Sequence, residues 1–158
     1  MEISGSRIIA APRHEVWMSL NDPDILRQCI PGCQEMTGST GEGFEAVVTQ
    51  KVGPVKATFR GTVTISDLVE AESYTISGEG KGGVAGFAKG SARVTLADVQ
   101  EGTELSYEVD ARVGGKIAQL GSRLITGTAR KFADRFFSAF QAAVEGEDEQ
   151  TTDGGAGT

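Results

Sequence analysis

The chain has 158 residues, which suits one domain with a real core, and a formal net charge of −7. No stretch is dense in Lys or Arg, so the sequence lacks the footprint of a nucleic-acid-binding protein and argues against docking on an anionic membrane face. No secretory signal and no apolar run of ~18 residues is visible, which predicts a cytoplasmic protein.

The first predicted elements are a strand over residues 2–10 and two short helices. Pro12 suits the first turn of the first helix, where a missing N–H costs nothing. Asp22 is a candidate N-cap for the second helix, Pro23–Cys29. The apolar residues of the first helix recur at helical spacing, which predicts a buried face: Val16, Trp17 and Leu20.

From Glu35 to Val113 the apolar pattern changes to a period of two. Turn residues such as Gly53-Pro54 and Gln100-Glu101-Gly102 divide this region into about six segments. Each segment has one apolar and one polar face, which is typical of an antiparallel sheet with one side in water.

A long helix is predicted to run from after the break at Gly114-Gly115 to about Val144. Its apolar residues recur at spacings of three, four or eight: Ile117, Leu120, Leu124, Phe132, Phe136, Phe140 and Ala143. Residues 145–158 are acidic and rich in Gly and Thr, so they are predicted to be a disordered tail. The domain therefore spans 1–144.

These elements predict an α+β fold in which a curved antiparallel sheet of about seven strands wraps a long C-terminal helix. Many inward positions are small, and the first half of the helix supplies no obvious partners for them, so a cavity is predicted there and a packed end near the phenylalanines. Glycines that merely let the sheet curve are the alternative. The predicted cavity residues are Phe59, Gly61, Tyr74, Ile76, Gly78, Ala92, Val94, Tyr107, Val109, Ala111, Ile117, Leu120, Gly121 and Leu124.

The order of elements resembles the helix-grip (START-like, Bet v 1-like, SRPBCC) superfamily. Several segments are similar to the carbon monoxide dehydrogenase G-subunit (CoxG) family: Ile9-Ala10-Ala11-Pro12, Val16-Trp17, Leu20-Asn21-Asp22-Pro23, Cys29-Ile30-Pro31-Gly32-Cys33, Gly53-Pro54-Val55, Phe59-Arg60-Gly61 and Gly78-Glu79-Gly80-Lys81-Gly82. The resemblance implies a role beside a molybdenum-containing carbon monoxide dehydrogenase or related hydroxylase, and a link to the membrane. Some members carry a longer C-terminal extension for membrane attachment, whereas residues 146–158 are short and acidic and predict no stable anchor.

The sequence offers little for catalysis. His14 is the only histidine, and the Cys29 and Cys33 pair lacks further ligands for a metal, so both cysteines are interpreted as small buried hydrophobes and no cofactor is predicted. The glycines from Gly78 to Gly83 precede no helix that could bind a phosphate. The predicted inward face carries almost no ionisable group apart from the phenols of Tyr74 and Tyr107, which could donate hydrogen bonds to a carbonyl.

Three functions remain open. The first is a non-catalytic carrier of an apolar small molecule, such as a quinone or another lipid, that serves the hydroxylase, makes transient contact with the inner face of the cell membrane and binds no nucleic acid. The second is a recruitment or assembly subunit that acts through its surface and has an incidental cavity. The third is an enzyme of the superfamily, such as a cyclase or hydrolase.

Overall fold

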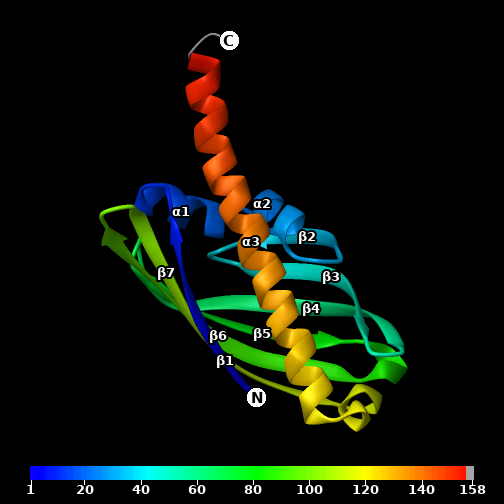
Figure 1. The fold of residues 1–158 in the computed structure, drawn as a ribbon. Coiled ribbons are helices and arrows are strands. Elements are labelled where there is room, and N and C mark those ends of the chain that lie inside the picture. Colours follow the sequence, from blue (N-terminus) through cyan, green and yellow to red (C-terminus); the bar gives the residue numbers. More distant parts are fainter. Residues whose placement is uncertain (156–158) are drawn as a thin grey trace.

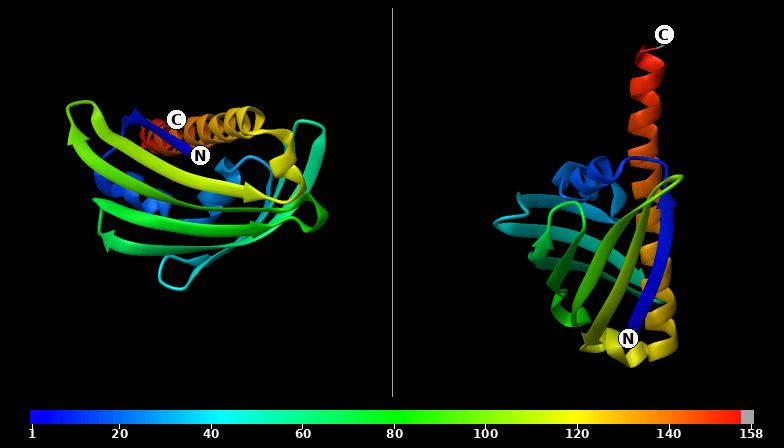
Figure 2. Two further views of the ribbon diagram at one scale, coloured as in Figure 1. Left: turned by 90° about the horizontal axis from the view of Figure 1, so that it is seen from below. Right: turned by 90° about the vertical axis from the view of Figure 1, so that its left-hand side faces the viewer.

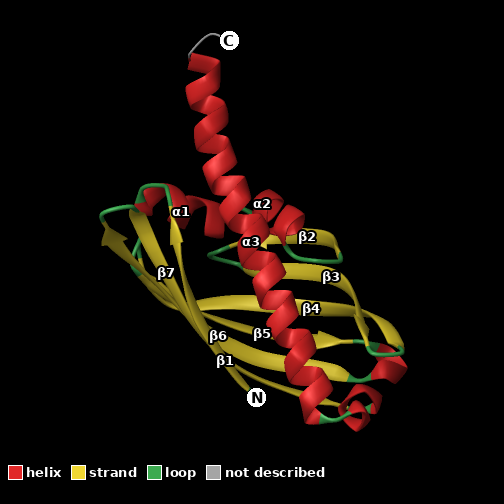
Figure 3. Cartoon of the chain, viewed as in Figure 1, coloured by secondary structure: helices red, strands yellow, loops and turns green. Residues whose placement is uncertain are grey.

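One curved sheet and one long helix make up most of the chain (Figure 1 and Figure 3). The computed structural model describes residues 1–155, and the side chains of residues 1–146. In chain order the elements are β1 (Glu2–Ile9), α1 (Arg13–Leu20), α2 (Pro23–Cys29), β2 (Cys33–Ser39), β3 (Gly43–Val52), β4 (Val55–Val69), β5 (Ser73–Lys81), the 3-10 turn η1 (Gly83–Ala85), β6 (Phe87–Val99), β7 (Gly102–Gly114), the 3-10 turn η2 (Lys116–Leu120) and α3 (Ser122–Gly155).

The sheet has seven strands in the order β1-β7-β6-β5-β4-β3-β2, and every neighbouring pair is antiparallel. Figure 2 shows that the sheet is strongly curved and that α3 lies across its concave side. We call this concave side the inner face and the opposite side the outer face. The predicted α+β architecture, with two short helices after the first strand, is confirmed.

The two short helices begin where their sequences predict. At α2 the Asp22 carboxylate accepts hydrogen bonds from the backbone N–H groups of Asp24, at 2.9 Å, and of Ile25, at 3.4 Å. These bonds satisfy two of the donors that a helix N-terminus leaves without partners. Pro12 is the N-cap of α1 and has an extended backbone conformation. Figure 1 shows both helices at one end of the sheet.

The hydrophobic core lies at that end, where α1, α2 and the second half of α3 meet the sheet. Trp17 packs on Tyr74 with ring centroids 5.1 Å apart, and Phe140 is fully buried. We call this region the packed end, and its buried residues are Ile9, Ala11, Val16, Trp17, Leu20, Ile25, Cys29, Tyr74, Val94, Leu96, Leu105, Phe137, Phe140 and Val144.

The helix α3 continues beyond Val144, where the sequence predicts the domain to end, and reaches Gly155. Glu145 belongs to the domain, because its carboxylate accepts hydrogen bonds from the Ala10 backbone N–H and the Gln141 side-chain amide, both at 2.9 Å. The predicted disordered tail otherwise falls on residues whose side chains lie outside the described part, and residues 156–158 lie outside it entirely. In Figure 1 the end of α3 projects beyond the sheet.

Removal of residues 147–158 should change the free energy of unfolding by less than about 0.5 kcal/mol, because a projecting end contributes few contacts. Glu145→Ala in the full chain should instead lower it by about 0.5–1.5 kcal/mol, because two hydrogen bonds lose their acceptor. Urea unfolding of both variants checks this. A truncated chain that is less stable than Glu145→Ala would show that the end of α3 packs on the domain.

Candidate ligand-binding face

The register of the sheet arranges the inner-face residues in rows that run across the strands. At the packed end, Leu96 lies opposite Leu105. The next row towards the start of α3 contains Tyr74, Val94, Tyr107 and Gly5, and the row after it contains Ile65, Ile76, Ala92, Val109 and Ile3. Side-chain volume therefore falls with distance from the packed end.

Two further rows consist almost entirely of small residues. The first contains Val63, Gly78, Gly90 and Ala111, and the second contains Gly61, Gly80, Ala88 and Val113. We call them the small-residue rows. They lie in the middle of the sheet on the side that α3 covers, yet each of these residues is only half-buried. Some surface of these residues therefore remains accessible, whereas a close-packed core would bury it.

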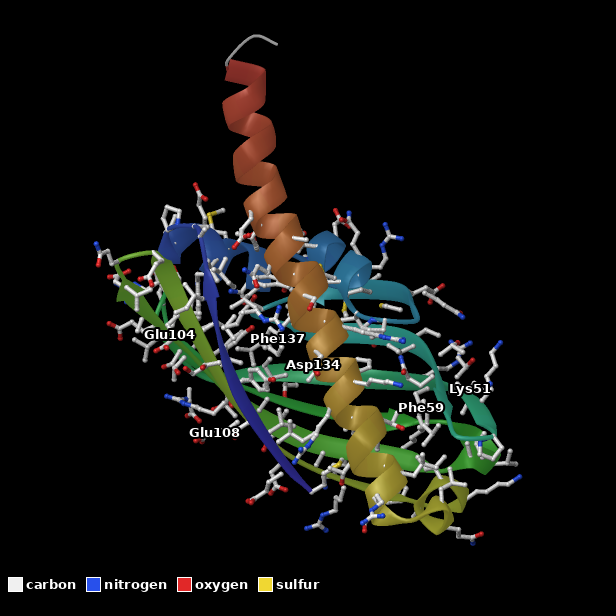
Figure 4. The ribbon with its side chains drawn as sticks, in the orientation of Figure 1. Lys51, Phe59, Glu104, Glu108, Asp134 and Phe137 are labelled. Carbon is white, nitrogen blue, oxygen red and sulfur yellow. The ribbon has the colours of Figure 1, made fainter. Side chains whose placement is uncertain are left out.

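The helix α3 contributes large side chains to the packed end and few to the small-residue rows. Phe137 and Phe140 are buried, and no residue of 122–136 belongs to the buried core. Gly127, in the first half of the helix, is exposed and has no side chain that could contribute to the core. Figure 4 shows Phe137 under the middle of α3 and Phe59 at the opposite end of the inner face. The helix is thus held at one end and stands over small residues at the other.

Tyr74 is a buried hydrogen-bond donor without a protein partner. The residue is 2% exposed, and burial raises the pKa of its phenol above the usual range, so the group stays protonated at neutral pH. No hydrogen bond in the described part of the chain involves the Tyr74 hydroxyl. Every polar side-chain atom there that is wholly buried does have a partner, so the Tyr74 hydroxyl is not wholly buried. The hydroxyl therefore touches space that water or a ligand group can reach.

Tyr107 is in the same row as Tyr74, with Val94 between them, and has more polar surroundings. Its ring stacks on Phe137 with centroids 4.4 Å apart and lies over Gly5, where a Cβ would be 2.6 Å from the Tyr107 hydroxyl oxygen. Burial raises the pKa of the Tyr107 phenol, the charge of Asp134 raises it further, and the Arg7 guanidinium opposes them. Both predicted tyrosines are therefore neutral donors rather than bases.

Arg7 is an inner-face residue that the sequence did not identify. It occupies an inward position of β1, opposite Leu105, and its guanidinium donates hydrogen bonds to the Ser138 hydroxyl at 3.2 Å and the Gln141 side-chain oxygen at 3.3 Å. The sequence signal that could have identified it is the imperfect alternation of apolar and polar residues around Arg7 in the first predicted strand. Because β1 is an edge strand, this charge can face α3 and remain partly hydrated.

Most of the predicted cavity residues lie on the inner face, but not all are enclosed. Tyr74, Val94 and Ile117 are buried, and Phe59, Gly61, Ile76, Gly78, Ala92, Tyr107, Val109, Ala111 and Leu120 are half-buried. The prediction that Leu124 is buried is wrong, since it is 39% exposed and lies over the β3–β4 turn at Gly53. Gly121 is also exposed, because it forms the turn between η2 and α3 with a φ of +97°. Both residues belong to the rim of the inner face.

A hollow lies on the outer face and does not coincide with the predicted site. It is an open cleft of about 470 Å³ lined by Glu35, Thr37, Glu45, Ala46, Val47, Arg60, Gly61, Thr62, Glu79 and Lys81. Gly61 is the one predicted cavity residue among them. An open cleft lined by five charged side chains is a poor site for an apolar molecule. It is better suited to contact with a polar partner, so the inner face remains the candidate site for an apolar ligand.

The cysteines and the histidine do not form a site in the described residues. Cys29 is buried in the packed end, and Cys33 is half-buried with its thiol donating to the Glu35 carbonyl oxygen at 3.3 Å. Burial raises the pKa of both thiols, and so neither is activated as a thiolate. Across the described residues no group of three or more potential metal ligands is present, and no helix there is long and apolar enough to cross a membrane.

An antiparallel sheet that grips one long helix on a partly open apolar face defines a helix-grip domain. Among solved structures, a conserved protein from Geobacillus kaustophilus has 28% identity and a TM-score of 0.84 and covers 92% of this chain and 95% of its own. Proteins from Thermus thermophilus (12% identity, 93% and 99% coverage) and Rhizobium leguminosarum (16% identity, 92% and 94% coverage) both have TM-scores of 0.70 and share the fold.

The chain belongs to the carbon monoxide dehydrogenase G-subunit (CoxG) family, whose family model matches residues 5–145. This confirms the family that the Asn-Asp-Pro and Ile-Pro-Gly-Cys segments indicated. No curated protein matches the chain. As a member of this family, the chain is related to an accessory subunit of carbon monoxide dehydrogenase.

Phe should be tolerated at Ala111, in the small-residue rows, but not at Ala11, in the packed end. We expect Ala111→Phe to cost less than about 1 kcal/mol of unfolding free energy, because its ring can enter open space, and Ala11→Phe to cost about 1–3 kcal/mol or more through overpacking. Urea unfolding monitored by circular dichroism measures both. Equal destabilisation by the two variants would show that the inner face is packed throughout.

Proposed function

We propose that this chain is a non-catalytic carrier that holds an apolar molecule, such as a quinone or another lipid, between the first half of α3 and the small-residue rows. The observation that carries the proposal is the half-buried state of glycines and alanines at the centre of the sheet. An apolar ligand there would remove this surface from water and complete the core, with about 25 cal/mol gained per Å² of apolar surface buried.

The polar groups near this space support a ligand with a carbonyl or similar acceptor. Tyr74 offers a protonated hydroxyl without a protein acceptor, and Tyr107 lies in the same row. Ligand sites of this kind are mostly apolar with a few polar groups that fix orientation. A quinone, with a flat apolar ring and carbonyl oxygens, has this chemistry.

The proposed partner is a carbon monoxide dehydrogenase or a related molybdenum hydroxylase, as the family membership suggests. A carrier beside such an enzyme would take up the ligand during transient contact with the inner face of the cell membrane and present it to the enzyme. The reaction itself would take place on the partner, since two phenols with raised pKa are poor general bases at neutral pH.

A recruitment subunit that acts through its surface is the second candidate, and the outer cleft favours it. The charged side chains of Glu35, Glu45, Arg60, Glu79 and Lys81 line this cleft without an ion pair in the described residues. Organic extraction of the purified chain followed by mass spectrometry separates the candidates. A co-extracted quinone or lipid supports the carrier, and an empty chain that still binds the purified hydroxylase supports recruitment.

Ala111→Phe should abolish binding of a soluble quinone analogue, because the added ring fills the proposed site. Ala97→Phe is the matched control, since Ala97 lies on the outer face of β6 and the same ring there should leave binding unchanged. Tryptophan fluorescence titration measures both affinities. Unchanged binding in a folded Ala111→Phe chain would refute this location.

Tyr74→Phe should weaken the quinone analogue by about twofold to tenfold, the loss of one hydrogen bond between neutral groups. The unfolding free energy should stay the same, because the hydroxyl has no protein partner to lose. A hydrocarbon of similar size provides the control, since its affinity should be equal for the two chains. A lower stability with unchanged quinone affinity would show that the hydroxyl serves the fold and not a ligand.

A further inference from the structure

A positive charge without a counter-ion lies on the concave side of the sheet. Arg7 is half-buried at an inward position of β1, and its guanidinium donates to Ser138 and Gln141 on α3. In the described residues Arg7 forms no ion pair. Glu145, a carboxylate of the same hydrogen-bond network, accepts from Ala10 and Gln141 instead. Partial burial of a charge is unfavourable without a counter-ion, so Arg7 is a candidate for binding an external anion.

The edge of the Arg7 guanidinium that suits an anionic group is free. Both bonds to α3 use the Nη1 atom, at 3.2 Å and 3.3 Å, whereas no described residue accepts from Nε or Nη2. The Nε and Nη2 donors of a guanidinium are arranged to bind two oxygens of one anion side by side. The bonds to α3 meanwhile hold the guanidinium in place. Arg7 is therefore fixed while its paired donors remain available to a ligand.

Two further polar groups lie near Arg7, between β1 and α3. Burial raises the pKa of the Tyr107 phenol, the Asp134 charge raises it further and the Arg7 charge lowers it, so both charges act on this phenol. Arg7 and Asp134 nevertheless form no ion pair with each other, and the Tyr107 hydroxyl forms no hydrogen bond to described residues. Figure 4 shows Asp134 close to Phe137, whose ring stacks on Tyr107. We call Arg7, Tyr107 and Asp134 the polar seam, and its three members do not satisfy one another.

The polar seam is continuous with the apolar inner face. The Tyr107 ring belongs to an inner row, and the absence of a side chain at Gly5 leaves room for it. The next row towards the small-residue rows contains Val109 and Ala92. Among the strand residues of the inner rows, all of which the structure describes, Arg7 is the one with a charged side chain. An apolar molecule on the inner face can therefore bring a charged substituent to Arg7 while its body stays on apolar surface.

We propose that Arg7 binds a negatively charged oxygen on the apolar ligand, either a carboxylate or the enolate of a hydroxylated ring. The inner face then selects acidic ring compounds over neutral compounds of the same shape, because hydrogen bonds to an ionised group are about twice as strong as those between neutral groups. Tyr107 donates a further hydrogen bond to the same group, and Asp134 weakens binding by repulsion. This proposal rests on the carrier function, since it assigns the polar end of the same ligand.

The test compares two small quinones by isothermal titration calorimetry of the full chain at neutral pH. Lawsone, a hydroxynaphthoquinone, is ionised under these conditions, whereas menadione, a methyl naphthoquinone of similar shape, is neutral. The wild-type chain should bind lawsone more tightly. Arg7→Gln should weaken lawsone by about tenfold and menadione by less than about twofold. Arg7→Lys should give an intermediate loss, because an ammonium keeps the charge without the paired donors. Asp134→Asn should strengthen lawsone by about twofold to threefold, the opposite direction.

Two control variants separate the proposed contact from other effects of these changes. Arg93→Gln removes the same charge from the outer face, where Arg93 donates to Thr75 and Ser73, and should leave both affinities unchanged. Ser138→Ala removes one bond that holds the Arg7 guanidinium and should keep the preference for lawsone. Naphthoate, which carries a carboxylate on a similar ring, distinguishes the two anionic groups, and binding of either anion that depends on Arg7 supports the proposal.

Three outcomes would overturn the proposal. The first is a wild-type chain that binds menadione as tightly as it binds both anions. The second is an equal loss of lawsone and menadione in Arg7→Gln, which would show that Arg7 only positions α3. The third is a loss in Arg93→Gln as large as that in Arg7→Gln, which would show that net charge alone is responsible. If the wild-type chain binds none of the three compounds, the carrier function fails as well.

Discussion

The stacking of Phe137 on Tyr107 determines how α3 lies on the sheet. A single helix has to cover the inner face of seven strands, and the large aromatic residues in its second half anchor it at the packed end. Phe136 and Phe140 extend this contact with centroids 5.9 Å apart, and aromatic pairs of this kind contribute about 0.5–1.5 kcal/mol each beyond burial. The first half of the helix is then carried over the small-residue rows without side chains that would fill them.

The stability of the domain and the openness of its inner face are therefore separated in space. The packed end holds the buried core, including Trp17 against Tyr74 and the capped start of α2. The small-residue rows contribute little to that core, because none of their residues belongs to the buried cluster. Tyr74 lies at the junction of the two regions, with its ring in the core and its hydroxyl in reachable space.

The charged residues are also distributed unevenly between the two ends of the sheet. The chain is acidic overall, but the end with the β3–β4 turn, η1 and η2 is basic. Lys51 lies opposite Lys56 and Arg60 lies opposite Lys81, and the carboxylates of Glu35, Glu45 and Glu79 line the outer cleft beside the second pair.

Local signals in the sequence were enough to identify the elements and the family. Period-two alternation identified the strands, Asp22 and Pro23 marked the start of α2, and the phenylalanines predicted the packed end, because these signals depend on near neighbours along the chain. The alignment of residues from different strands is a property of the folded chain alone. The row that joins Gly78 to Gly90 and Ala111, the pairing of Lys51 with Lys56, and the position of Leu124 over Gly53 all depend on strand register and on the angle of α3. Register brings together residues far apart in the chain, and so no local pattern could show which small residues and which charges lie side by side on the sheet.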